Sequence, residues 1–311
     1  MKSIQKIILL FLLALSFPIA QAQELYVKTF GKPQDKPILF LHGGPGYNSA
    51  GFEISTAQKL ADQGFFVIVY DRRGEGRSVD TNARFNFEQT FSDINSIRTK
   101  YDLNQLNLMG HSFGGIVAIL YAQQFPQNVG SVLLVSAPVA LQESFATIQN
   151  ASRKLYESKN DQVNLKYLDM LAAMDHSSME YASYSFMHAM QNGFYTPRKP
   201  NDEAKLIYQQ MAPNPNYKYV TAMTREAPMG FWKNEKYTTL DLTQNIRSLV
   251  SNKIKIFGIY GVEDGLYSVE QVEKLGQLIG KANLIYVENA AHNVFIDQQQ
   301  TFWVSVKQYL Q

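Results

Sequence analysis

The sequence predicts an α/β fold, a mostly parallel, doubly wound sheet with an inserted helical cap. Strongly apolar runs alternate with stretches of helical spacing over residues 37–135, which is typical of a parallel sheet covered on both faces. No such strand run occurs from about 140 to 246, where helical stretches rich in Tyr, Met and Gln follow one another. The α/β alternation returns at 255–260. We therefore expect a core of residues 23–138 and 247–311 and a helical cap of residues 139–246.

The core elements follow from local patterns along the chain. Residues 24–30 alternate like a half-buried strand and end at a glycine, whereas the later strands are apolar throughout. These later strands are expected at 37–41, 65–70, 106–109, 131–135, 255–260 and 283–287. Amphipathic or apolar helical spacing predicts helices at 54–63, 87–101, 116–122, 268–279 and 298–310.

The first 22 residues have the pattern of a signal peptide. Lys2 and Lys6 form a positive segment, residues 7–17 are apolar but short for a membrane span, and Ala20-Gln21-Ala22 is an A-x-A cleavage site. We expect the mature chain to start at Gln23, in the periplasm or the medium, without a stable membrane anchor. An uncleaved N-terminal anchor is the alternative.

Composition narrows the class of protein. Among 311 residues, 29 Lys and Arg face 27 Asp and Glu, so nothing in the net charge of +2 calls for nucleic acid as a partner. The chain has no cysteine, which excludes disulfides, a thiol nucleophile and a thiolate metal site. The sequence predicts no metal and no cofactor, points to a small-molecule or short-peptide substrate, and leaves the oligomeric state open.

One pentapeptide stands where a strand gives way to a helix. Gly110-His111-Ser112-Phe113-Gly114 follows the apolar run 106–109 and precedes the helical stretch 116–122. In this context G-x-S-x-G indicates a nucleophile elbow, a turn so tight that glycine is needed beside the serine. We expect the Ser112 hydroxyl to stand at the tip of the turn, although a plain Gly/Ser-rich loop would fit the bare motif as well.

A base and an acid for that serine are available after later strands. Asp264 lies on a turn after the strand at 255–260, and His292 lies on the loop after 283–287. The order Ser, acid, His is that of α/β-hydrolases, with His292 as base and Asp264 as its orienting partner. Glu263 is an alternative acid. The other histidines, His42, His111, His176 and His188, do not follow a late strand.

The loop after the strand at 37–41 contains glycines that suit an oxyanion hole. A tetrahedral intermediate needs two backbone donors, and the N–H of Phe113, next to the proposed nucleophile, is the first. The second is expected from His42-Gly43-Gly44-Pro45-Gly46, with Gly44 favoured and Gly43 as the alternative. The charged loop Asp71–Ser78 is interpreted as a structural support near this segment.

The chain resembles the α/β-hydrolases of the proline iminopeptidase (prolyl aminopeptidase) family. The resemblance rests on the H-G-G-P-G block at 42–46, the loop 71–78, the elbow 110–114, and the Asp264 and His292 turns, and it spans nearly the whole mature chain. It implies a serine exopeptidase that releases an N-terminal residue, often proline, beneath a helical cap and without a metal.

The chain departs from that family at two places. His111 and Phe113 flank the elbow serine where Gly and Trp are usual, and the stretch 181–188 lacks the W-x-x-W-E segment whose glutamate binds the substrate amine. Other carboxylates of the cap could take that role, since an ammonium in a partly dry pocket needs one. The candidates are Glu180, Glu203 and Glu226, each of which also suits a solvated helix face.

Two aromatic residues of the cap complete the expected site. Phe231 and Trp232 could line the acyl pocket or belong to the core of the cap. Together these features predict an exported serine hydrolase, with an aminopeptidase for N-terminal proline or another small residue favoured. An esterase, lactonase or amidase acting on small uncharged substrates is the alternative.

Overall fold

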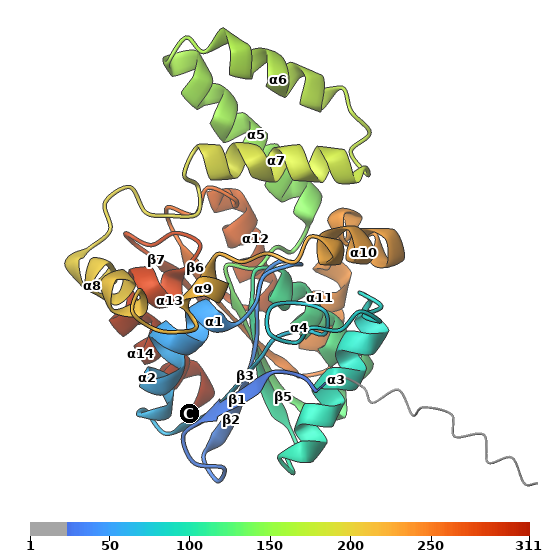
Figure 1. Cartoon of the computed structure of the whole chain (residues 1–311), viewed down its shortest axis with the longest axis vertical. Helices are drawn as coiled ribbons and strands as arrows, with labels where there is room; N and C mark the ends of the chain where they lie inside the picture. Colours follow the sequence, from blue (N-terminus) through green and yellow to red (C-terminus); the bar gives the residue numbers. More distant parts are fainter. Residues whose placement is uncertain (1–23) are drawn as a thin grey trace, which may run out of the picture.

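A computed structural model describes residues 24–311, so the predicted signal peptide lies outside the described residues. Within this range the chain forms a seven-stranded sheet in the order β1-β3-β2-β4-β5-β6-β7 (Figure 1). β1 pairs with β3 in antiparallel register and the other neighbours are parallel. The strands are β1 (Val27–Phe30), β2 (Lys36–Leu41), β3 (Phe65–Tyr70), β4 (Leu106–His111), β5 (Val129–Val135), β6 (Lys255–Gly261) and β7 (Leu284–Val287).

Helices cover both faces of this sheet, as the predicted α/β fold requires. The central strands are buried on both sides because their side chains enter two separate clusters: Leu39 and Leu41 join one, and Ile38 and Phe40 the other. The first cluster includes side chains of α3 (Phe87–Lys100), α4 (Phe113–Gln124), α11 (Thr243–Ser251) and α12 (Val269–Ile279). The second includes side chains of α1 (Ala50–Phe52), α2 (Gln58–Ala61), α13 (Val294–Asp297) and α14 (Gln299–Leu310).

One predicted helix is interrupted. The stretch expected at 54–63 is built from a π-helical segment over Glu53–Ala57 and α2, and α1 directly precedes it. The side chain of Glu53 is buried in this segment and binds Arg77 at 2.6 Å and Lys28 at 2.8 Å. Arg77 and Lys28 lie in other segments of the chain, so the periodicity of the helical stretch does not predict these ion pairs.

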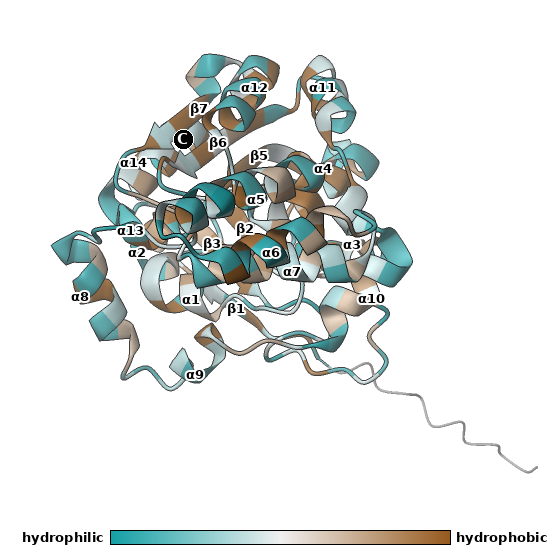
Figure 2. Cartoon of the chain, turned by 90° about the horizontal axis from the view of Figure 1, so that it is seen from above, coloured by the Kyte–Doolittle hydropathy of each residue, from teal (hydrophilic) through white to brown (hydrophobic). Residues whose placement is uncertain are grey.

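A run of six helices lies between β5 and α11, the helix that precedes β6. They are α5 (Leu141–Ser158), α6 (Gln162–Ala172), α7 (Met179–Gln191), α8 (Asp202–Met211), α9 (Tyr217–Val220) and α10 (Glu226–Glu235). Helices α5, α6 and α7 stand at one end of the molecule (Figure 1), and Figure 2 shows them lying across the sheet when it is seen from above. Phe145 of α5 packs edge-on against Tyr181 and Phe186 of α7.

The chain leaves and re-enters the sheet layer at one junction. The N–H of Leu242 donates to the carbonyl of Val139 at 2.8 Å, and Ala140 forms an isolated antiparallel bridge with Asp241. The residues between these two segments are called the insertion below. Among residues 24–311, no helix combines the length and apolar character needed to span a bilayer.

Candidate active site

Ser112 occupies a strained turn between β4 and α4. Its backbone has φ 52° and ψ −124°, a conformation outside the usual regions for a non-glycine residue. The turn is possible because glycines flank it: a Cβ on Gly110 would lie 2.5 Å from the Gly114 carbonyl, and one on Gly114 would overlap the Leu41 carbonyl. The Ser112 side chain is partly exposed at the start of α4, as the elbow motif predicts.

His292 and Asp264 meet at the carboxyl ends of β6 and β7. His292 Nδ1 and Asp264 Oδ2 are 2.8 Å apart, and both side chains are buried. Because a carboxylate accepts, Nδ1–H is the donor, and Nε2 is left as the basic nitrogen of the neutral ring. The backbone N–H of Leu266 donates to the other oxygen, Oδ1, at 3.1 Å, which fixes the carboxylate.

Glu263, the alternative acid, has a different partner. Its Oε2 accepts from the backbone N–H of Arg198 at 2.7 Å, so this carboxylate ties the insertion to the turn after β6. The structure therefore joins Asp264, and not its neighbour, to His292.

The elbow lies next to the loop that carries His292. Nε2–H of His111 donates to the carbonyl of His292 at 3.1 Å, and the two rings are 4.9 Å apart between centroids. Burial, with His292 as the second cause, lowers the pKa of His111 to about 3, so His111 is neutral at physiological pH. Within residues 24–311, the Ser112 hydroxyl makes no hydrogen bond to His292. Catalytic hydrogen bonds are often long or poorly aligned in enzymes without substrate.

Arg72 shapes the glycine loop after β2. Its Nη2 donates to the Gly43 carbonyl at 2.6 Å, and its Nη1 donates to the His42 carbonyl. In a trans peptide the N–H points opposite to the C=O, so the N–H groups of Gly43 and Gly44 both point away from Arg72. Neither N–H donates to another group within the described range. A Cβ on Gly43 would lie 3.2 Å from Ser112 Cβ, which places these amides beside the elbow.

A buried ion pair holds Arg72 in turn. Arg72 Nη2 lies 2.8 Å from Glu75 Oε2, both side chains are almost fully buried, and Glu75 also accepts from the N–H of Gly46 at 3.1 Å. Burial raises the pKa of Glu75, with Arg72 opposing that shift. The sequence predicts a structural role for the loop Asp71–Ser78 but does not single out Arg72 or Glu75. The feature that could have indicated them is a pair of opposite charges directly after the buried strand β3.

His42 is part of the same support. Its Nε2 accepts from the backbone N–H of Arg72 at 3.0 Å, so Nδ1 carries the proton and donates to the Gly43 carbonyl at 2.8 Å. Burial, followed by the charge of Arg72, holds the pKa of His42 well below its usual range. A neutral His42 therefore buttresses the loop.

Of the predicted binding residues of the insertion, the three glutamates are exposed and the two aromatic residues are at least partly buried. Glu180, Glu203 and Glu226 are exposed in the first turns of α7, α8 and α10. Phe231 is buried and its ring lies 5.2 Å from that of Phe113, next to the elbow serine. Trp232 is half-buried and donates from Nε1 to the Ser177 carbonyl at 2.9 Å.

Two residues near His292 were not anticipated from the sequence. The ring of Tyr195, from the segment after α7, meets the imidazole edge-on at 5.1 Å. Asp297 is 1% exposed; its Oδ2 accepts from the N–H of Ala291 at 2.9 Å, while its Oδ1 is buried without a partner. Burial raises the pKa of Asp297 to about 7. Asp297 lies five residues after His292 in a short helix, and no sequence motif there predicts a buried carboxyl group.

No cluster of three or more His, Asp or Glu side chains suited to a metal occurs among residues 24–311. What the site offers is a serine on a strained turn, an imidazole paired with a carboxylate, and backbone N–H groups beside the serine. This is the set of groups that acyl transfer through a serine requires.

Comparison with known proteins finds relatives over half or more of the chain. A proline iminopeptidase of Clostridioides difficile is 33% identical over 187 residues, which is 55% of this chain and 61% of that protein. The chain thus spans about six-tenths of that relative's length. A putative proline iminopeptidase of Mycoplasma pneumoniae is 24% identical over 88% of this chain and 90% of its own length.

Solved structures share the fold over nearly the whole chain. A proline iminopeptidase-related protein of Thermus thermophilus superimposes with a TM-score of 0.66 at 21% identity, covering 94% of this chain and 95% of that one. An esterase of Exiguobacterium antarcticum gives a TM-score of 0.58 at 17% identity, covering 92% and 95%. The family model for the alpha/beta hydrolase fold matches residues 36–299, and the chain belongs to this family.

Proposed function

We propose that the chain is a serine hydrolase that forms an acyl-enzyme on Ser112. The observation that carries the proposal is the Asp264–His292 hydrogen bond of 2.8 Å on the loops beside the elbow. Nε2 of His292 takes the proton from the Ser112 hydroxyl as its oxygen attacks the substrate carbonyl, and later gives that proton to the leaving group. Water then attacks the acyl-enzyme, with His292 again as base, and releases the acid.

Backbone amides would stabilise the tetrahedral intermediate. The Phe113 N–H, which has no acceptor within residues 24–311 and lies in the first turn of α4, is one donor. The Gly44 N–H is the other, with Gly43 as the alternative. Each such donor contributes about 2.7–4 kcal/mol to transition-state stabilisation in serine hydrolases.

The test is covalent labelling with a fluorophosphonate. The parent protein should take up one phosphonyl group on Ser112, and Ser112→Ala should take up none and lose turnover while keeping its circular dichroism spectrum. Labelling at another residue, or turnover retained by Ser112→Ala, would show that the nucleophile is wrongly assigned.

For the substrate we propose an aminopeptidase releasing N-terminal proline or another small residue, because relatives covering most of the chain are named proline iminopeptidases. A second candidate is an esterase, lactonase or amidase for uncharged substrates. One observation favours it: Glu180, Glu203 and Glu226 are exposed, whereas an ammonium in a partly dry pocket needs a carboxylate there. Brisk cleavage of proline naphthylamide would support the first, and cleavage of nitrophenyl acetate with negligible turnover of that naphthylamide would support the second.

We also propose export, on the signal-peptide pattern of residues 1–22. N-terminal sequencing of the protein recovered from periplasm and medium should begin at Gln23. Recovery of the uncleaved chain with the cell membrane would contradict this.

A further inference from the structure

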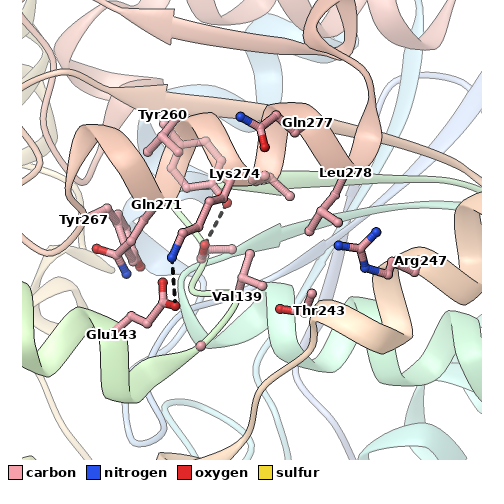
Figure 3. A pocket seen from close by; sticks show the side chains of 14 residues that line it. Val139, Glu143, Thr243, Arg247, Tyr260, Tyr267, Gln271, Lys274, Gln277 and Leu278 are labelled. Atoms are coloured by element: carbon pink, nitrogen blue, oxygen red, sulfur yellow. Dashed lines mark hydrogen bonds and ion pairs between the residues drawn. The ribbon is translucent and has the colours of Figure 1, made fainter.

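A pocket lies at the base of the insertion, and one of the residues that line it, Tyr267, also stacks on the His292 ring. It is a cavity of about 290 Å³ between the start of α5, helix α11 and helix α12 (Figure 3). We propose that this pocket binds a small amphiphilic anion, a carboxylate head on an apolar body, with Arg247 holding the head.

The walls of this pocket come from both parts of the molecule. Val139 and Thr243 stand on the two chain segments that join the insertion to the core. The α12 wall is tied to α5 by Thr147 donating to Gln271 Oε1 at 2.7 Å and by an ion pair of 3.2 Å between Lys274 and Glu143. A ligand here would contact the insertion and the core at once.

Part of the lining is apolar, and two tyrosines contribute their rings to that part. The hydroxyl of Tyr260 donates to the Ala137 carbonyl at 2.7 Å, and that of Tyr267 donates to the Ser136 carbonyl at 2.8 Å. With both hydroxyls engaged, the rings are what these residues present to a ligand. Four aliphatic side chains extend this apolar part: Val139, Val272, Leu275 and Leu278. The rest of the lining is mostly polar and includes Gln271, Gln277 and Thr243.

The charge at the mouth is positive. Lys274 is neutralised by Glu143, whereas Arg247 on α11 is exposed and forms no ion pair within residues 24–311. Figure 3 shows the Arg247 side chain extending toward Thr243 and Leu278, at the edge of the apolar lining. A guanidinium binds a carboxylate through two parallel hydrogen bonds. An anionic head at Arg247 would therefore place its apolar body against Leu278 and the ring surfaces.

Octanoate is the probe, titrated calorimetrically into the intact protein. Loss of a hydrogen bond to a charged group weakens binding by about tenfold or more, so Arg247→Ala should bind octanoate at least about tenfold more weakly. The charge-matched Lys307→Ala, on an exposed position of α14, should bind within about twofold of the parent. Leu278→Trp, which fills the apolar end, should abolish binding, and neutral octanol should bind the parent at least tenfold more weakly.

Two results would overturn the proposal. One is the absence of saturable octanoate binding by the parent. The other is equal affinity of the parent and Arg247→Ala, which would place octanoate elsewhere, including at Ser112. Neither result depends on fluorophosphonate labelling, so this inference and the proposed function can fail separately.

Discussion

At the scale of single residues, the pairing of His292 with Asp264 decides which imidazole nitrogen is basic. Asp264→Asn presents an amide that can hold the opposite tautomer, with the proton on Nε2. We expect kcat to fall by about 10⁴-fold near neutral pH while the fold is retained. The measurement is a pH–rate profile on whichever substrate class proves active.

Glu263→Gln is the matched control for that variant. It removes the neighbouring charge but keeps an oxygen that can accept from Arg198 N–H, so we expect kcat within a few-fold of the parent. Equal losses in both variants would mean that the turn, and not Asp264, matters for the reaction.

Asp297 links stability to pH. Burial raises its folded-state pKa to about 7, above the unfolded value of about 3.9. Between these values the folded state holds a proton that the unfolded chain has released, so this group lowers the free energy of unfolding as pH rises, by up to about 1.4 kcal/mol per pH unit. Urea unfolding of Asp297→Asn at pH 5 to 8 should show this decline removed. A parent and variant with the same pH slope would contradict the assignment.

Site residues that follow a strand could be predicted from the sequence, whereas residues buried by contacts with distant loops could not. Asp264 and His292 could be predicted because each follows a recognisable strand, and parallel strands end at the same edge of a sheet. Arg72, Glu75 and Asp297 matter because they are buried against loops from elsewhere in the chain. This burial results from tertiary packing, which local sequence patterns do not predict.

At the scale of elements, the close approach of α4 to β2 sets the elbow. A Cβ on Gly114 would overlap the Leu41 carbonyl, which is backbone and cannot turn aside. We expect Gly114→Ala to lower the free energy of unfolding by about 1–3 kcal/mol or more and to reduce labelling of Ser112. Urea unfolding and the rate of phosphonylation measure the two effects.

Gly276 in α12 supplies the comparison. A Cβ there would find its nearest neighbour, Leu284 Cδ1, at 4.0 Å, an ordinary contact. Gly276→Ala should therefore raise stability by about 0.5–1 kcal/mol through helix propensity and leave labelling unchanged. If both variants behaved alike, the tight approach at the elbow would not be what requires Gly114.

Element boundaries show where periodicity is sufficient evidence. The apolar strands at 65–70 and 255–260 were predicted to within a residue of β3 and β6, because continuous burial leaves a continuous apolar run. The helix expected at 298–310 is α14, which begins one residue later, at Gln299. A separate short helix, α13, ends just before it at Asp297 and was not predicted. Gln299 is buried at the start of α14 and donates from Nε2 to the Ser55 carbonyl at 2.8 Å, a contact with a distant segment.

At the scale of the whole molecule, the insertion touches each loop of the proposed site. The Phe194 carbonyl accepts from Gly265 N–H at 3.0 Å on the acid turn, and Thr224 N–H donates to the Gly46 carbonyl at 2.7 Å on the glycine loop. Asn201 Nδ2 donates to the Asp297 carbonyl at 2.9 Å, in the helix after His292. The insertion thus contributes to the placement of groups that the core strands carry.

Substitution of Asn201 can separate the effect of the insertion on the placement of His292 from its effect on helix stability. Asn201 also caps α8, with its Oδ1 accepting from Ala204 N–H at 2.7 Å. Asp161 caps α6 in the same way at 3.1 Å, and within residues 24–311 its side chain forms no hydrogen bond or ion pair with the core. Asn201→Ala and Asp161→Ala should each lower the free energy of unfolding by about 1 kcal/mol. Only Asn201→Ala should also lower kcat/KM, because it alone releases the helix that follows His292. Matching losses of kcat/KM in both variants would assign the effect to the stability of the insertion, and unchanged kcat/KM in Asn201→Ala would mean that the core strands place His292 unaided.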